Sequence, residues 1–291
     1  MVGPSPWSWP KTYPASLRRE TKCPGRRVEV MAHLGGDTDI ASLAALLADQ
    51  GRARILLALG DGRALAASTL AAEAGVAAST ASVHLAKLVD ADLLSVEAHG
   101  RHRYYRLSGP QVAELLEALA HLAPVAPVRS LRQGTQARAL RAARSCYDHL
   151  AGRLGTDLMA ALLAKDVLSG GDGLFHPEQP GNDRLSAARH GDVEYRLTEH
   201  GASALRDLGL ELSVTTHRPM VRYCVDWSEQ RHHLAGALGA ALLSWLVDLG
   251  WVRRSPTSRA LQVTDAGRAG LTANFGVELD CADDSPASAS G

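Results

Sequence analysis

The chain has 291 residues and carries 31 basic and 31 acidic side chains, so its bulk charge favours neither nucleic acid nor a membrane surface. Hydrophobic residues make up 46% of the chain and aromatic residues only 4%, which disfavours aromatic-rich sandwiches and sugar-binding clefts. The length suits about two domains, and we expect a mainly α fold with small β-hairpins. A charged partner must then be met by a local patch.

The two ends of the chain differ in composition from the middle. Residues 1–30 hold five of the thirteen prolines and predict a disordered leader, with Met31 as a possible start, while residues 281–291 predict a disordered tail. The sequence shows neither a signal peptide nor an apolar run long enough for a membrane span. The four cysteines are dispersed, which is typical of a reducing compartment. We expect a soluble, cytoplasmic protein with no membrane partner.

Residues 39–122 show the pattern of a small DNA-binding domain. A short helix at 69–74, a turn at Gly75 and a longer helix at 78–90 form a predicted helix-turn-helix. Two strand-like runs follow and predict a β-hairpin, or wing, at 94–107 with a basic tip. Helix-turn-helix followed by a wing is an arrangement typical of proteins that read DNA.

The helix after the wing begins near Pro110 and carries an apolar stripe. Pro124 and Pro127 end it, so we assign 31–128 to a DNA-binding and dimerisation domain. The stripe either packs on its own domain or pairs with a second copy. Its members are Val112, Leu115, Leu116, Leu119 and Leu122.

The helix at 78–90 is the expected recognition helix. Ala81, Leu85 and Leu88 share one face and should pack inward, which turns the other faces toward the major groove. For His84 the alternative is a hydrogen bond within the core, and for the wing tip it is a hairpin that only faces solvent. The candidate DNA contacts on the helix and the wing are Ser79, Thr80, Ser82, Val83, His84, Lys87, Arg101, His102 and Arg103.

In order and spacing these elements resemble the winged helix-turn-helix of the ArsR/SmtB family. The matching segments are 49–56, 70–76, 79–88 and 100–107. The resemblance implies a homodimeric regulator, a repressor in our interpretation, that binds an inverted repeat in double-stranded DNA and answers to a small-molecule or metal inducer. The metal-binding cysteines that such regulators carry before the recognition helix are absent, because residues 65–74 contain no Cys or His.

The second half, 129–280, contains an internal repeat. The run His149–Gly155 recurs 84 positions later as His233–Gly239, and Tyr195–Gly201 recurs more loosely 66 positions later. The difference falls in a Gly/Pro-rich insertion between Ser169 and Asp192. We therefore expect a regulatory domain built from two units, at about 135–212 and 213–280.

Each unit is predicted to have one helix through the His-Leu-Ala-Gly run and a second at 158–164 or 241–249. Two strands and a last helix follow, so the units are interpreted as degenerate winged-helix-like repeats. Before them, a linking helix carries a row of arginines that either contact DNA phosphates or form a solvated cationic face. These are Arg129, Arg132, Arg138, Arg141 and Arg144.

A second echo, Arg-x-Cys-x-Asp, occurs at 144–148 and 222–226. Packing the units face to face would bring together Cys146, His149, Cys224 and His233, a set that suits zinc or another soft metal, or a thiol that responds to an oxidant. Arg144 and Arg222 are candidate cations that would lower the thiol pKa.

The alternative for this set is structural. Only Cys146 and His149 have tight ligand spacing, and an intracellular cysteine is often a small buried hydrophobe. Asp226 with Glu229 resembles a helix-capping box, and Asp148 is a candidate cap for its own helix.

We find no phosphate loop, zinc-protease motif or nucleophile elbow in the sequence, and we assign no catalytic residue and no required cofactor. The expected function is therefore DNA-binding transcriptional regulation without enzymatic activity. The alternative is a thiol- or metal-handling enzyme with an appended DNA-binding domain.

Overall fold

The computed structural model describes residues 38–100, 102–128, 130–177, 193–212, 218–256 and 258–279. The predicted leader at 1–30 and tail at 281–291, together with Arg101 and Arg129, lie outside this range. From Ile40 onward the described chain forms one compact unit. None of its helices in this range has the length and apolar character that crossing a bilayer requires.

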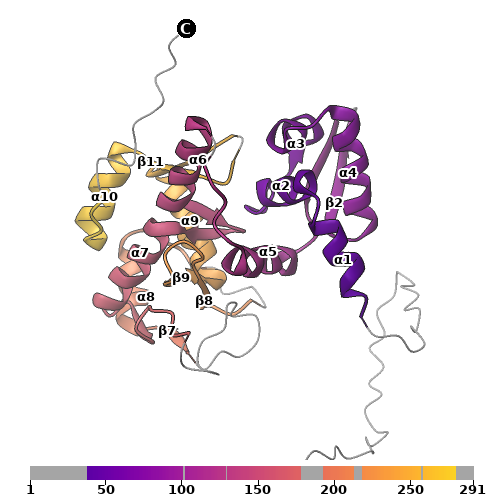
Figure 1. The fold of residues 1–291 in the computed structure, drawn as a ribbon. Coiled ribbons are helices and arrows are strands. Elements are labelled where there is room, and N and C mark those ends of the chain that lie inside the picture. The colour runs from indigo at the N-terminus through magenta and orange to yellow at the C-terminus, as the bar shows by residue number, and fades with distance from the viewer. Residues whose placement is uncertain are drawn as a thin grey trace, which may run out of the picture. The chain divides into compact units, whose positions relative to one another are not determined.

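The first half is a winged helix-turn-helix, as predicted (Figure 1). Its three strands form one antiparallel sheet in the order β1-β3-β2, and β2 and β3 are the two strands of the wing. The elements are α1 (Ile40–Leu47), α2 (Gln50–Ala58), β1 (Leu65–Ala66), α3 (Ala67–Ala74), α4 (Ala78–Asp90), β2 (Leu94–His99), β3 (His102–Leu107) and α5 (Pro110–Leu122).

Gly75 makes the turn between α3 and α4, because its backbone adopts the left-handed conformation, with φ of 69°, that glycine tolerates best. Ala81, Leu85 and Leu88 of α4 are buried, which confirms the predicted inward face. Leu85 and Leu88 join Ile55 and Leu70 in one apolar core. The start of α4 at Ala77 has no side-chain cap, as its sequence predicts.

The second half begins with the linking helix α6 (Leu131–Ala142), and the chain then repeats one order of elements twice, hairpin, helix, hairpin, helix. The first repeat consists of β4 (Arg144–Cys146), β5 (His149–Ala151), α7 (Gly152–Ala164), β6 (Leu168–Gly170), β7 (Tyr195–Leu197) and α8 (Glu199–Asp207). The second consists of β8 (Arg222–Val225), β9 (His232–Ala235), α9 (Gly236–Asp248), β10 (Val252–Arg254), β11 (Leu261–Val263) and α10 (Asp265–Phe275).

The predicted helix through each His-Leu-Ala-Gly run is wrong. His149–Ala151 is a strand that pairs with Arg144–Cys146, and the helix starts only at Gly152, where φ is 77°. All three strand residues are buried, so the run lacks the alternation that marks a half-exposed strand. Each repeat therefore has one helix, α7 or α9, where the sequence predicted two. Its likeness to a winged helix is limited to this helix, the strand pair that follows and the last helix.

The two repeats pack reciprocally, α7 against β9 and α9 against β5. Gly155 and Gly239 permit this approach. A Cβ on Gly155 would lie 3.5 Å from the Cβ of His233 in the other repeat, and one on Gly239 would lie 3.2 Å from that of His149. Within its own repeat each added Cβ would also lie too close to a strand carbonyl oxygen, 2.7 Å from that of Leu150 and 2.6 Å from that of Leu234. The repeated glycine is therefore a packing requirement.

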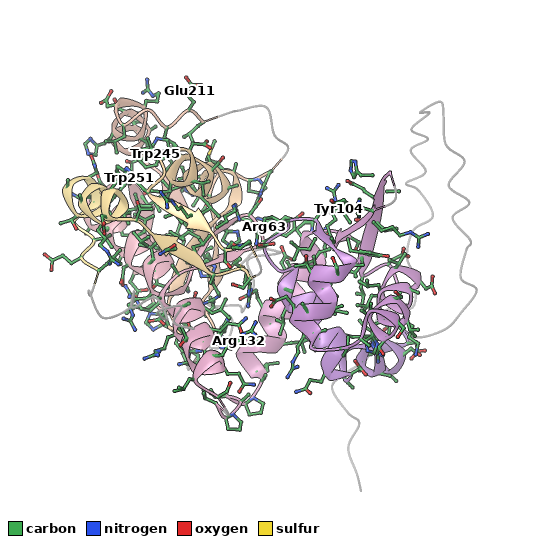
Figure 2. All side chains as sticks on the ribbon, turned by 90° about the horizontal axis from the view of Figure 1, so that it is seen from above. Arg63, Tyr104, Arg132, Glu211, Trp245 and Trp251 are labelled. Atoms are coloured by element: carbon green, nitrogen blue, oxygen red, sulfur yellow. The ribbon has the colours of Figure 1, made fainter. Side chains whose placement is uncertain are left out.

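The looser echo also has a structural cause. Thr198 and Thr264 accept hydrogen bonds from the backbone N–H groups of Gly201 and Gly267, at 2.8 and 3.0 Å, and so begin α8 and α10. A Cβ on Gly201 would lie 2.2 Å from the Val167 carbonyl oxygen, and one on Gly267 would lie 2.1 Å from that of Trp251. Near these elements, Trp245 and Trp251 contact edge to face, with ring centroids 5.4 Å apart (Figure 2).

We predict that Gly239→Ala lowers the free energy of unfolding by about 1–3 kcal/mol, because the added methyl clashes with the Leu234 carbonyl oxygen of its own repeat and crowds His149 of the other. Gly134→Ala in α6 is the matched control. Its Cβ meets only the exposed Val128 side chain, so helix propensity should leave stability unchanged or raise it by up to about 1 kcal/mol. Urea unfolding of both variants tests this, and equal stability of the two would contradict it.

Candidate DNA interface and cysteine–histidine cluster

The exposed face of α4 contains most of the predicted DNA contacts. Ser79, Thr80, Ser82, Val83 and Lys87 are all exposed, and Val83 has 55% of its surface accessible. The Ser82 hydroxyl donates to the Ala78 carbonyl at 2.9 Å, so its oxygen remains available to a further donor. The arrangement offers short polar and methyl groups to a partner.

His84 does not share that face. Its side chain is only 12% exposed, and Nε2 lies 3.6 Å from a carboxylate oxygen of Asp49. Asp49 also caps α2 by accepting from the Arg52 N–H at 2.9 Å. His84 therefore packs α4 against the start of α2, which favours the core role that the sequence left open, and we do not retain it as a base contact.

The wing presents exposed basic residues close to its tip. His102 and Arg103 are exposed at the start of β3, opposite His99 and Ala98 of β2. Gly100 makes the turn with φ of 61°, and Arg101 lies outside the described residues. Tyr104 follows Arg103 on the same strand and is labelled in Figure 2.

Two helices leave large apolar side chains exposed. On α5, Leu119 is 41% and Leu122 73% exposed, although Leu116 is buried. On α1 no residue is fully buried, and Ile40 is 70% exposed. The predicted stripe therefore divides, with part of it in the core and its C-terminal end open.

The structure brings together the four ligand-type residues that the repeat suggested, a set that we call the Cys₂His₂ cluster. Cys146 and His149 come from the β4–β5 hairpin, and Cys224 and His233 from the β8–β9 hairpin. Their ligand atoms all lie within 4.8 Å of one another, and the Cys224 sulfur is 3.6 Å from His149 Nε2. Cys224 is partly exposed and the other three are buried.

Each histidine has its own carboxylate partner. His149 Nδ1 lies 3.2 Å from Asp148, and His233 Nδ1 lies 3.4 Å from Asp226. Burial would raise the pKa of Asp148, but His149 and Arg218 outweigh it and hold that pKa at about 2. Asp148 lies in the hairpin turn between β4 and β5, so the predicted helix-capping role is wrong.

The thiol of Cys146 is not activated. A hydrogen bond with Cys224 and burial raise the pKa of Cys146 to about 12. Arg144, a predicted activating cation, instead ion-pairs with Asp226 at 2.9 Å and lies over the Trp227 ring. These surroundings are unlike those of a reactive thiolate.

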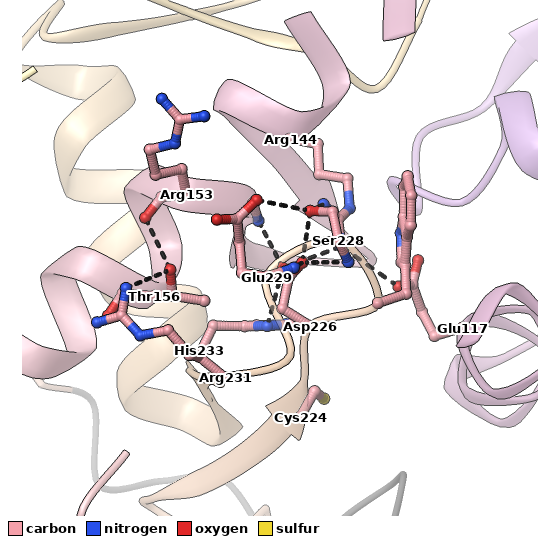
Figure 3. Close-up of polar contacts among 12 residues, drawn as sticks. Glu117, Arg144, Arg153, Thr156, Cys224, Asp226, Ser228, Glu229, Arg231 and His233 are labelled. Carbon is pink, nitrogen blue, oxygen red and sulfur yellow. Dashed lines mark hydrogen bonds and ion pairs between the residues drawn. The ribbon is translucent and has the colours of Figure 1, made fainter. Parts of the chain in front are cut away.

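A buried ion-pair network, which sequence reasoning missed, surrounds Asp226 (Figure 3). Arg144 has no exposed surface, which excludes the solvated or DNA-facing role expected for it on the linking helix. Its Nη2 lies 3.8 Å from Glu117 of α5, and Arg259 also donates to Glu117. The network therefore joins α5 of the winged domain to both repeats.

Asp226 is also not the start of a helix. It lies in the turn between β8 and β9, where it accepts from the backbone N–H groups of Ser228 and Glu229 and, across the repeats, from that of Gly152 at 2.7 Å. The Asp226–Glu229 pattern therefore correctly indicated local hydrogen bonding, but the helix that it predicted is absent at this position. Burial would raise the pKa of Asp226, whereas His233 and Arg144 hold it well below its usual range.

Comparison with known proteins places the same segment among DNA-binding domains. The model of a helix-turn-helix domain family matches residues 47–97. YdfF of Bacillus subtilis (strain 168), an uncharacterized HTH-type transcriptional regulator, is 38% identical over 243 residues, a match that covers 83% of this chain and 99% of that protein.

Three solved structures are similar to the N-terminal part of the chain. Reduced HlyU from Vibrio cholerae is 27% identical, with 30% of this chain and 90% of that chain covered and a TM-score of 0.27. NolR from Sinorhizobium fredii is 30% identical, covering 30% and 86%, with a TM-score of 0.28. The AntR antimony-specific transcriptional repressor is 27% identical, covering 35% and 94%, with a TM-score of 0.27.

We predict that Glu117→Gln destabilises the protein by about 3–5 kcal/mol, because it leaves the buried Arg259 guanidinium without its carboxylate and removes one of the two acids beside Arg144. Burial would raise the pKa of Glu117, but Arg259 and Arg144 outweigh it and hold that pKa below its usual value. The ion pair's contribution is therefore complete above the ordinary glutamate pKa and is lost as the pH falls through the lowered one.

The measurement is the difference in unfolding free energy between wild type and variant at neutral and acidic pH. Glu114→Gln, on the same helix but outside this network, serves as the control and should change stability by less than about 0.5 kcal/mol. Equal effects of the two substitutions at neutral pH would contradict the prediction.

Proposed function

Because the chain belongs to the HTH-type transcriptional regulators, as its 38% identity over nearly the whole length of one of them shows, we propose that it is a homodimeric repressor that binds an inverted repeat in double-stranded DNA. The observation that carries the proposal is the exposed face of α4 beside a wing with a basic tip. The C-terminal repeats act as the signal-receiving part. A regulator is favoured over the alternative of a thiol-handling enzyme because Cys146 is buried and its thiol pKa is raised, whereas a catalytic cysteine needs a thiolate.

In this proposal α4 enters the major groove. The exposed Ser79, Thr80 and Ser82 offer hydroxyl groups to base edges or phosphates, and Val83 offers methyl groups to thymine. Long forked donors are absent from this face in the described helix, so direct readout of guanine has little support. Selectivity then depends on short-range contacts and on the shape of the duplex.

The wing supplies the electrostatic part of binding. Arg103 and His102 are exposed near the tip, and Lys87 adds a charge at the last turn of α4. Each phosphate contact releases a condensed counterion, so these residues set the salt dependence of the affinity rather than the choice of sequence.

A second copy of the chain is the proposed occupant of the apolar surface on α1 and α5. Ile40 of α1 and Leu119 and Leu122 of α5 are 70%, 41% and 73% exposed, and a contiguous apolar surface of such side chains marks a site of association. A twofold dimer would present two recognition helices to two half-sites, which explains the preference for an inverted repeat.

The buried network offers a route by which the repeats would influence the dimer. Glu117 lies on the face of α5 that meets Arg144 and Arg259, whereas Leu119 and Leu122 lie on its exposed part. A change in the repeats that moves Arg144 would therefore also shift α5, the helix that we assign to the dimer contact. Repression lifted by such a signal is the role that this arrangement supports best.

We predict that Arg101→Ala combined with Arg103→Ala weakens binding to all duplexes and lowers the salt slope by about one to two, one for each lost phosphate contact. The probe is a duplex that the wild type selects from a random-sequence pool, and the measurement is fluorescence anisotropy over a salt series. Arg196→Ala with Arg206→Ala removes the same charge from exposed sites in the first repeat and should leave the slope unchanged. An unchanged slope for the wing variant would remove the wing from the interface.

We also predict that Leu119→Glu with Leu122→Glu shifts the protein from dimer to monomer, because two charges cannot be buried there without partners. Sedimentation equilibrium measures the mass. Leu249→Glu, at a comparably exposed leucine of the second repeat, should leave the dimer intact. If wild type is already a monomer, or if the double variant remains a dimer, α5 does not form the contact.

A further inference from the structure

The Cys₂His₂ cluster has a feature that its packing role does not explain. His233 has no exposed surface, and within the described part of the chain neither of its ring nitrogens makes a hydrogen bond, although Nδ1 lies 3.4 Å from an Asp226 oxygen. A buried imidazole nitrogen without a partner loses a hydrogen bond with water and gains none in return. Cys146, Cys224 and His149 surround it with three further soft or borderline ligand atoms.

We propose that Cys146, His149, Cys224 and His233 bind one Zn²⁺ ion, which joins the two C-terminal repeats. Two thiolates and two imidazoles are a ligand set that zinc prefers, and it accepts them in tetrahedral geometry. The pairs come from equivalent hairpins, β4–β5 and β8–β9, so each repeat supplies one cysteine and one histidine.

The distances fit such an ion closely. With zinc about 2.3 Å from sulfur and about 2.0–2.1 Å from nitrogen, a tetrahedron separates a sulfur and a nitrogen ligand by about 3.5 Å. The Cys224 sulfur and His149 Nε2 are 3.6 Å apart, and no two ligand atoms exceed 4.8 Å. Side-chain rotations that bring the more distant ligand atoms closer together would complete the site.

The carboxylates orient the ligands. Asp148 is within hydrogen-bond distance of His149 Nδ1, and Asp226 lies 3.4 Å from His233 Nδ1, so both carboxylates favour a proton on Nδ1 and leave Nε2 to ligate. This pairing of imidazole with carboxylate recurs in both repeats, at the equivalent Asp of Arg-x-Cys-x-Asp. Both aspartates have arginine partners, Arg218 and Arg144, so their charges are balanced without the ion.

Charge balance suits the buried position. Binding releases to solvent the two thiol protons and any second proton on the imidazoles, and the resulting Zn²⁺ with two thiolates and two neutral imidazoles has no net charge. Such a complex can be buried without an unpaired charge. The partly exposed Cys224 lies on the route by which the ion would enter. Four protein ligands leave no open position, so the ion has a structural or regulatory role rather than a catalytic one.

A regulatory role rests on the DNA-binding function proposed above. His233 lies beside Asp226, Asp226 pairs with Arg144, and Arg144 approaches Glu117 of α5. Loading the site fixes the position of the β9 histidine and so favours one arrangement of this buried network. We expect zinc to change the affinity for DNA by about 5- to 150-fold, the usual range for coupled sites.

The first test is metal binding by the full chain. Metal-free wild type, prepared under reducing conditions, is titrated with Co²⁺ and then Zn²⁺ and followed by absorption and native mass spectrometry. We expect one ion per chain, tetrahedral cobalt bands with a thiolate charge-transfer band, and displacement by zinc. Cys146→Ser with Cys224→Ser should lose the ion and the thiolate band, whereas Cys23→Ser with Cys281→Ser should retain both.

The proposal would be overturned if the wild type showed no thiolate–cobalt band. It would also be overturned if, after reduction and metal addition, the two cysteines formed a disulfide and no metal was bound. The same holds if the Cys146, Cys224 double variant binds cobalt as the wild type does. Because the wild-type spectrum alone decides between these outcomes, a variant that fails to fold does not leave the question open.

A second pair of variants separates ligation from general stability. Asp148→Asn removes the partner of His149, and we expect it to weaken zinc binding by about 10- to 100-fold. Asp157→Asn is matched to it, since Asp157 also forms an ion pair with an arginine and is 31% exposed against 32% for Asp148. Equal zinc affinity of the two variants would argue that Asp148 does not support the site.

The coupling is tested last, on the duplex that the wild type selects. DNA affinity of the wild type is measured with zinc and after its removal by a chelator, and the same is done for Cys146→Ser with Cys224→Ser, which should not respond. An equal affinity in both states of the wild type would overturn the regulatory role and leave the zinc site standing. Absence of DNA binding in every state would instead overturn the proposed function.

Discussion

A single buried carboxylate, that of Asp226, connects the parts of this molecule. It has no exposed surface and accepts from Arg144 at 2.9 Å, from the Gly152 N–H at the start of α7, and from the turn that carries it. An anion at a helix N-terminus is stabilised by the free N–H groups of the first turn, and here the same oxygen also neutralises an arginine. The position of α7, the β8–β9 turn and the arginine therefore depend on one another.

The sequence predicted the elements whose pattern is local. The faces of α4 follow from a period of 3.6 residues, and the glycine turn before it follows from the left-handed conformation at Gly75. The repeat predicted that the two cysteine–histidine pairs would meet, although the predicted secondary structure of the histidines was wrong. A fully buried three-residue strand such as His149–Ala151 has no alternating pattern by which to distinguish it from a helix.

Other parts of the site depend on partners far apart in the chain. Glu117 and Arg259 are 142 positions apart, and a glutamate beside a leucine stripe gives no indication of which arginine will approach it. His84 likewise packs against Asp49, a contact that requires the relative placement of α2 and α4. The sequence places Arg144 in a row of arginines that either contacts DNA phosphates or faces solvent, yet the chain enters β4 at that residue and Arg144 is buried.

The backbones of both repeats also form hydrogen bonds with the winged domain. The Tyr147 N–H, in the β4–β5 turn, donates to the Gly60 carbonyl at 2.7 Å, and Arg63 donates to the Ser258 carbonyl at 3.0 Å. Because of these contacts and the Glu117–Arg259 pair, the winged domain cannot be replaced by that of another protein without breaking buried interactions. A chimaera that joined these repeats to another regulator's DNA-binding domain would leave the buried Arg259 guanidinium without a carboxylate, unless the incoming last helix placed an acid where Glu117 now lies.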